Sequence, residues 1–116
     1  MSDAKRKDAN TEEIKNAIEE CGWGYIDTHA FGKGFPDCIA IKTLGSDDIY
    51  ATVFIEIKTE HGRVTQSQKA FYKKYPNLVY VVESAEQVKK LLDKFVDDLL
   101  FSALVTLHNG NAKRKK

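Results

Sequence analysis

Two carboxylates and one lysine near the middle of the chain form the pattern with the clearest chemical meaning. Asp37 follows Pro36, and Glu56 and Lys58 stand two positions apart in the apolar run 54–58. Side chains alternate along a strand, so Glu56 and Lys58 are expected on the same face. Charged groups are costly to bury alone. The three charged side chains are therefore expected to lie together and form one site.

This set of residue types suits metal-dependent hydrolysis. Carboxylates on two adjacent strands, Asp37 on one and Glu56 on the other, supply the hard oxygen ligands that Mg²⁺ prefers, with water and substrate phosphate completing its shell. Water oriented near Lys58 is then placed to attack a phosphodiester, while the cation offsets the charge of the transition state.

The pattern of apolar and capping residues predicts the elements that position this site. The predicted order is α-β-β-β-α-β-α: a helix over 11–21, strands over 25–29, 37–41 and 50–58, a helix over 65–75, a strand over 78–82 and a helix over 84–100. The second and third strands are expected to form a hairpin across the turn at 45–48, and a glycine-rich loop spans 31–36. This order predicts an α/β fold, with one mixed sheet flanked by helices.

Local signals support several of these boundaries. Thr65 and Gln68 match a capping box, and so do Ser84 and Gln87. The first helix is expected to begin near residues 10–11 with a polar cap and to end at Gly22. The strand over 78–82 is almost continuously apolar, which is typical of a strand covered on both faces.

Length and composition indicate one small globular domain. The chain has 116 residues, of which 42% are hydrophobic and 30% charged, with a net charge of +1. A flexible basic N-terminus is predicted for 1–10, a single domain for 11–108 and a flexible basic tail for 109–116. No segment resembles a signal peptide or a membrane span. The two cysteines, Cys21 and Cys38, are too few for a disulfide scaffold, so a reducing cytoplasmic setting is expected.

The motif string as a whole resembles the PD-(D/E)xK nuclease superfamily, in particular small stand-alone phage-type members of the VRR-NUC family, and is similar to archaeal Holliday-junction resolvases. The matching pieces are Gly34-Phe35-Pro36-Asp37, Ile55-Glu56-Ile57-Lys58, Gly62, Thr65-x-x-Gln68 and Ser84-x-Glu86. The resemblance covers about residues 11–92, most of the chain, and its phage-type members imply a bacterium or a phage-infected cell as the setting. The resemblance implies a restriction-endonuclease-like core.

The resemblance also implies roles for individual residues. Asp37 and Glu56 would bind Mg²⁺, for which Mn²⁺ would substitute, Lys58 would position or activate the water, and Gln68 would lie beside the site. Members of the family also use a glutamate on the first helix as a metal ligand. Glu13 is the expected counterpart, with Glu12 and Glu20 as the alternatives.

Each of these residues also has a purely structural interpretation. Glu13 would then be the capping partner of Asn10, and Gln68 that of Thr65. Asp37 would be a turn residue, and Glu56 and Lys58 a solvated pair on an edge strand.

Other side chains near the motif favour structural roles. His29 and His61 are expected at a strand end or in a loop, with His61 close enough to Lys58 to contact substrate. Trp23, Tyr25 and Phe35 are expected in the core or in a wall of the site rather than as surfaces on which bases stack.

Basic side chains gather after the motif. Residues 58–74 carry a net +4, with Arg63, Lys69, Lys73 and Lys74 as expected sequence-independent phosphate contacts. A solvated helix face is the alternative for Lys73 and Lys74. By contrast, residues 11–110 carry 11 basic and 15 acidic side chains, and some of that negative charge belongs to the expected metal ligands.

These features predict an Mg²⁺-dependent DNA endonuclease that acts by direct attack of water. The family resemblance alone implies branched DNA, such as the four-way junction, as its substrate. Small relatives of this kind act as homodimers, and the apolar segment Phe101–Leu107 is a candidate interface. One alternative is a nuclease of nicking, flap or restriction type. A second is a nucleic-acid-binding module that keeps the fold without cleavage, and a third is a small α/β protein with no nucleic-acid role.

Overall fold

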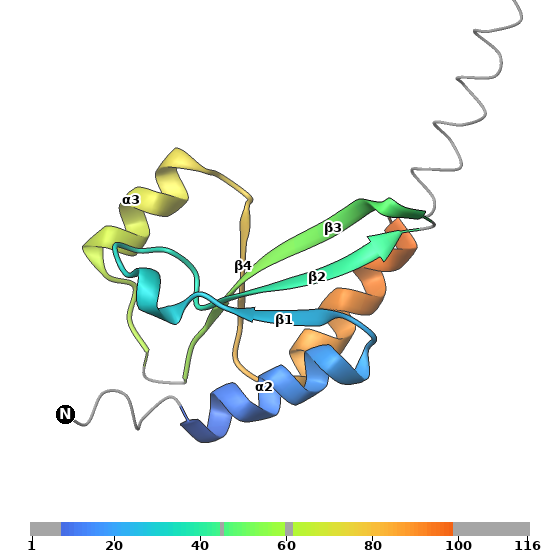
Figure 1. Ribbon diagram of the computed structural model, residues 1–116. Coiled ribbons are helices and arrows are strands. Elements are labelled where there is room, and N and C mark those ends of the chain that lie inside the picture. The colour runs from blue at the N-terminus through green and yellow to red at the C-terminus, as the bar shows by residue number, and fades with distance from the viewer. Residues whose placement is uncertain (1–7, 45, 60–61, 99–116) are drawn as a thin grey trace, which may run out of the picture.

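The order of elements predicted from the sequence is confirmed. The computed structural model describes residues 8–44, 46–59 and 62–98 (Figure 1). Its elements are α2 (Asp8–Glu20), β1 (Gly24–Asp27), a short 3₁₀ helix η1 (His29–Phe31), β2 (Cys38–Leu44), β3 (Ser46–Ile57), α3 (Gln66–Lys74), β4 (Val79–Val82) and a final helix over residues 85–98. The predictions for the basic N-terminus, the segment Phe101–Leu107 and the basic tail concern residues wholly or largely outside these ranges.

The four strands form one mixed sheet in the order β1-β2-β3-β4. β1 pairs with β2, and β2 with β3, in antiparallel fashion, so the expected hairpin is confirmed. β4 returns from α3 and pairs in parallel with β3, placing Glu56 opposite Val81. Glu56 therefore lies on a central strand. This excludes the interpretation of Glu56 and Lys58 as a solvated pair on an edge strand.

Two helices cover one face of this sheet and build the core with it. In Figure 1, α2 and the helix over 85–98 lie together on that side. The core consists of apolar side chains from both helices and three of the strands, with Trp23 between: Ile14, Ala17, Ile18, Trp23, Cys38, Ala40, Ala51, Val53, Ile55, Val82, Val88 and Leu92. Each large side chain buried there contributes about 1.5–3 kcal/mol. Burial raises the pKa of the Cys38 thiol to about 12, so this cysteine remains protonated.

The first helix ends as expected but begins earlier. Gly22 has a φ of +87°, and the backbone N–H groups of Gly22 and Trp23 donate to the carbonyls of Glu19 and Ile18, which is a Schellman ending. The helix begins at Asp8 instead of near residues 10–11. Asn10 therefore lies within the helix, and the interpretation of Glu13 as its capping partner is wrong.

Two expectations about strands were also wrong. β1 ends at Asp27, and the chain then turns into η1 instead of continuing as a strand to His29. In β4, Val82 is buried but Val81 is 52% exposed. β4 is an edge strand, and α2 and the helix over 85–98 cover only the face that Val82 occupies, so its apolar run did not indicate burial on both faces.

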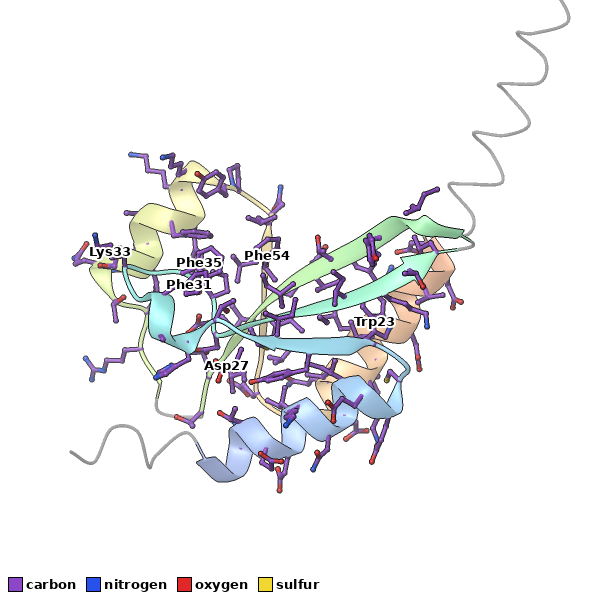
Figure 2. The ribbon with its side chains drawn as sticks, in the orientation of Figure 1. Trp23, Asp27, Phe31, Lys33, Phe35 and Phe54 are labelled. Atoms are coloured by element: carbon purple, nitrogen blue, oxygen red, sulfur yellow. The ribbon has the colours of Figure 1, made fainter. Side chains whose placement is uncertain are left out.

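Loop 31–35 packs against α3 on the other side of the molecule. Figure 2 shows Phe31 and Phe35 between this loop and α3, with Phe54 close to them. The Phe35 ring lies 6.0 Å from that of Phe54 and 5.5 Å from that of Phe71, centroid to centroid. These edge-on contacts attach the loop and α3 to the sheet.

Among the residues that the structure describes, no helix combines the length and the apolar character needed to cross a bilayer.

Gly34 permits the close approach of loop 31–35 to α3. Its φ is +82°, and a Cβ built on it would collide with the backbone of Ser67 and Gln68. Gly32 also has positive φ, at +65°, but a Cβ there would meet open space. We therefore expect Gly32→Ala to cost about 1–2 kcal/mol through backbone strain alone. Gly34→Ala should cost at least about 2 kcal/mol more, measured as the free energy of unfolding in urea. Equal costs for the two variants would contradict this close contact.

Candidate functional site

The site lies at one end of the sheet, where β1 and β3 end and β2 begins. Asp37 stands immediately before β2, and its Oδ2 accepts a hydrogen bond of 2.8 Å from the backbone N–H of Ile57 on β3. The carboxylate is thereby fixed across two strands. It faces a cavity of about 310 Å³ that Glu56, Lys58 and Arg63 also line. The structure thus brings together the two carboxylates and the lysine that the sequence singled out.

Gln68 joins Glu56 to Lys58. Its Nε2 donates to Glu56 Oε2 at 2.7 Å, and its Oε1 accepts from Lys58 Nζ at 2.9 Å. The amide thus satisfies the anion and the cation through its two ends. The same Oε1 accepts from the backbone N–H of Thr65, whose hydroxyl accepts from Gln68 N in turn. The predicted capping box is confirmed, and Gln68 serves the helix and the charged cluster at once.

Lys58 is held by three acceptors. Besides Gln68 Oε1, its ammonium donates to the carbonyl of Arg63 at 3.0 Å and lies 3.4 Å from Glu56 Oε2. Its side chain is only 14% exposed. A lysine has three N–H donors, so this arrangement fixes the charge at the wall of the cavity.

Glu56 is a buried carboxylate that the protein only partly satisfies. The residue is 3% exposed, and its Oε1 has no hydrogen-bond partner among the described residues. Burial, followed by the negative charge of Asp37, raises the pKa of Glu56 to about 7 against the lowering effect of Lys58. The ionised form is therefore destabilised at a place where two carboxylates meet.

A divalent cation suits this arrangement. Oε1 of Glu56 lacks a partner, the two carboxylates repel each other, and carboxylate oxygen is the ligand type that Mg²⁺ prefers. Within the described ranges no group of three or more His, Cys, Asp or Glu side chains is placed to hold a metal. Asp37 and Glu56 are the two carboxylates here that would hold such an ion.

The structure does not bring Glu13 to this cavity. Glu13 is exposed on α2, and the helix lines the cavity with Asn10 and Thr11 instead. Of the two alternatives, Glu20 lies at the other end of α2 and pairs with Lys89 at 2.8 Å. Glu12 is exposed on α2 and does not line the cavity either.

Sequence reasoning missed other members of this cavity. Asp27, at the end of β1, lines it, and its carboxylate accepts from the backbone N–H of His29 at 2.8 Å. His29 also lines it, with Nδ1 3.8 Å from Asp37 Oδ1, although a purely structural role was favoured for it. The available signal was that Asp27, His29 and Asp37 lie close together in the sequence, on the two sides of one connecting loop. His61 lies outside the described residues.

Tyr72 approaches the same carboxylates from α3, one helical turn after Gln68. Its hydroxyl is buried without a hydrogen-bond partner in the described part of the chain. Burial, followed by the charges of Glu56 and Asp37, raises the pKa of Tyr72. A helix places residues i and i+4 on one face, so the position of Gln68 already indicated that Tyr72 would face the site.

The four expected phosphate contacts occupy different positions. Arg63 lines the cavity, whereas Lys69 and Lys73 are exposed on α3. Lys74 lines a second cavity between α3 and loop 31–35, with its Nζ 5.5 Å from the centroid of the Tyr75 ring.

Comparison of the chain with protein-family models, curated proteins and solved structures found no match.

The buried Glu56 carboxylate should make the stability of the protein depend on pH. The native state holds the Glu56 proton more tightly than the unfolded chain does. The stability that this proton contributes is therefore fully present below about pH 4.5 and is lost as the pH rises to about 7. In EDTA we expect wild type to lose up to about 3 kcal/mol of unfolding free energy across this window relative to Glu56→Gln. Urea denaturation of both proteins at several pH values measures this difference in unfolding free energy.

Glu19→Gln is the matched control, because Glu19 is exposed on α2. This variant should follow the wild-type pH profile. Parallel profiles for wild type and Glu56→Gln would show that Glu56 ionises in the native state at no cost.

Proposed function

We propose that this protein is a Mg²⁺-dependent endonuclease with a restriction-endonuclease-like core, of the PD-(D/E)xK superfamily and the VRR-NUC type. The observation that supports it most is the single network of Glu56, Gln68 and Lys58 beside Asp37. Asp37, Glu56 and Lys58 line one cavity, and Gln68 binds both Glu56 and Lys58 behind it. Their types are those that phosphodiester hydrolysis needs.

The side chains divide the work in this proposal. Asp37 and Glu56 hold the cation, which supplies charge stabilisation at the reacting phosphate when bound. Lys58, fixed by Gln68 and the Arg63 carbonyl, orients the attacking water at the cavity wall. Arg63 contacts the phosphate backbone from the same cavity, and the exposed lysines of α3 contact it farther along.

The proposed substrate is branched DNA, with the four-way junction as its example, cut by a homodimer in the cytoplasm. A symmetric junction needs two cuts, which a two-fold dimer supplies. A nicking, flap or restriction-type specificity is compatible with the same catalytic residues.

The second candidate is a nucleic-acid-binding module without cleavage. Burial of Glu56 with one oxygen unpartnered argues against it. An unsatisfied buried charged group costs several kcal/mol, and a module that only binds gains nothing from it.

A cleavage assay tests the enzyme. Labelled four-way junction, linear duplex and single strand are incubated with Mg²⁺, Mn²⁺ or EDTA. We expect cleavage with either metal, none in EDTA, and a rate at least about 100-fold lower for Lys58→Ala, because the water loses its orienting group. Lys90→Ala, which removes an exposed lysine of the final helix, should leave the rate unchanged.

Two results would contradict the proposal at different levels. Intact DNA in every metal-containing reaction would exclude the enzyme. Equal cutting of the three DNAs would exclude selectivity for branched structures while leaving the chemistry standing.

The dimer is tested separately. Light scattering after gel filtration should give twice the chain mass of 13.1 kDa at micromolar concentration. A monomer at these concentrations would count against paired cutting by one assembly.

A further inference from the structure

A second cavity lies beside the candidate active site and has a different chemical character. It encloses about 490 Å³ between loop 31–35 and α3, within the range of small-ligand pockets. Four aromatic rings line it, those of Phe31, Phe35, Phe71 and Tyr75. We name it the aromatic cavity.

The rings of the aromatic cavity are only partly used by the fold. Phe35 packs on Phe54 and Phe71 and so belongs to the contact that anchors α3. Phe31, whose ring centroid is 5.1 Å from that of Phe35, is nevertheless 64% exposed, and Tyr75 is 43% exposed. Two aromatic faces are thus presented to solvent at the edge of an already packed cluster.

Its charge differs from that of the candidate active site, where acidic residues lie beside Lys58 and Arg63. Lys33 and Lys74 line the aromatic cavity, and none of the described residues that line it is acidic. Figure 2 shows Lys33 on the loop, close to Phe31 and Phe35. The first cavity, by contrast, contains Asp27, Asp37 and Glu56.

The two cavities share the elements that build them. His29 lines the first and Phe31 the second, two residues apart in η1, so their Cα atoms are separated by at most about 7 Å. On α3, Gln68 binds the catalytic carboxylate while the adjacent Ser67 lines the aromatic cavity. A strand with its phosphate at Asp37 therefore passes the aromatic cavity within about one or two nucleotides.

We propose that the aromatic cavity binds an unpaired nucleobase of the DNA strand being cut. Every base has a flat face that stacks on an aromatic ring, and such stacking is worth about 1–3 kcal/mol per base. Lys33 and Lys74 attract the flanking phosphates, which explains the pairing of exposed rings with positive charge. This inference rests on the proposed nuclease function and deepens it: the enzyme selects DNA whose bases are unpaired next to the scissile phosphate.

Binding without metal tests the inference. The probe is a duplex with one unpaired 2-aminopurine, compared with the same duplex fully paired, both in EDTA. Wild type should bind the bulged probe at least about 5-fold more tightly, and its fluorescence should fall on binding because the base stacks. Phe31→Ala should weaken that binding by about 5- to 100-fold and leave the paired duplex unaffected. Ile49→Ala, which removes an exposed apolar side chain of β3, should change the binding of neither duplex.

A second variant separates charge from stacking. Lys33 has a φ of +55°, a conformation that asparagine tolerates well, so Lys33→Asn removes the charge and keeps the loop. It should weaken binding of both duplexes and lower the salt dependence by about one counterion, with the fluorescence change retained.

Several outcomes would overturn the inference. Equal affinity of wild type for the two duplexes, or unchanged fluorescence on binding, would show that no base enters the cavity. A change of oligomeric state in Phe31→Ala, with DNA binding unaltered, would assign the rings to contact with a second copy.

The failure of this inference is distinguishable from failure of the proposed function. Metal-dependent cleavage that Phe31→Ala does not alter on either duplex would reject the base site and leave the enzyme. Base binding that depends on Phe31, without cleavage of any DNA, would keep the base site and reject the enzyme.

Discussion

The burial of the Glu56 carboxylate on the central strand is the constraint around which this end of the molecule is organised. An anion with only 3% exposure requires partners. The chain supplies them from a separate element, because the Gln68 amide binds Glu56 with one end and Lys58 with the other. The first turn of α3 must therefore lie over the end of β3. That placement in turn requires loop 31–35 to pass close to α3, which the absence of a side chain at Gly34 permits.

The same arrangement leaves part of the charge uncompensated. Lys58 offsets one carboxylate, but Asp37 repels Glu56, and Glu56 Oε1 has no partner among the described residues. A fold selected only for stability would replace such a group with an apolar side chain. Local violations of this kind concentrate at functional sites, where a ligand supplies the missing compensation. In the proposed metal-bound form, the cation would supply this missing compensation.

Sequence reasoning succeeded where the determining interaction is local. Strand alternation and spacing correctly predicted that Asp37, Glu56 and Lys58 lie together. The capping motif correctly predicted Gln68 at the start of α3. Sequence reasoning failed where the outcome depends on how elements pack. The start of α2 at Asp8 brings Asn10 and Thr11 to the cavity in place of Glu13. The exposure of Val81 follows from the position of β4 at the edge of the sheet, which no feature of its own apolar run reveals.

The aromatic cavity shows why such features escape a periodicity argument. Phe31 is the last residue of the 3₁₀ helix η1, and the chain then passes through positive φ at three successive residues, Gly32, Lys33 and Gly34. Neither helical nor strand periodicity applies to that backbone, so the sequence cannot show which ring is buried. The helix η1 contributes His29 to the cavity of the candidate active site and Phe31 to the aromatic cavity. Since α3 forms a wall of the aromatic cavity and supplies the Gln68 that holds Glu56, a shift of loop 31–35 relative to α3 would alter both sites together. The proposed recognition of an unpaired base and the alignment of the Asp37 and Glu56 carboxylates would then depend on one packing contact, that of Gly34 against the first turn of α3.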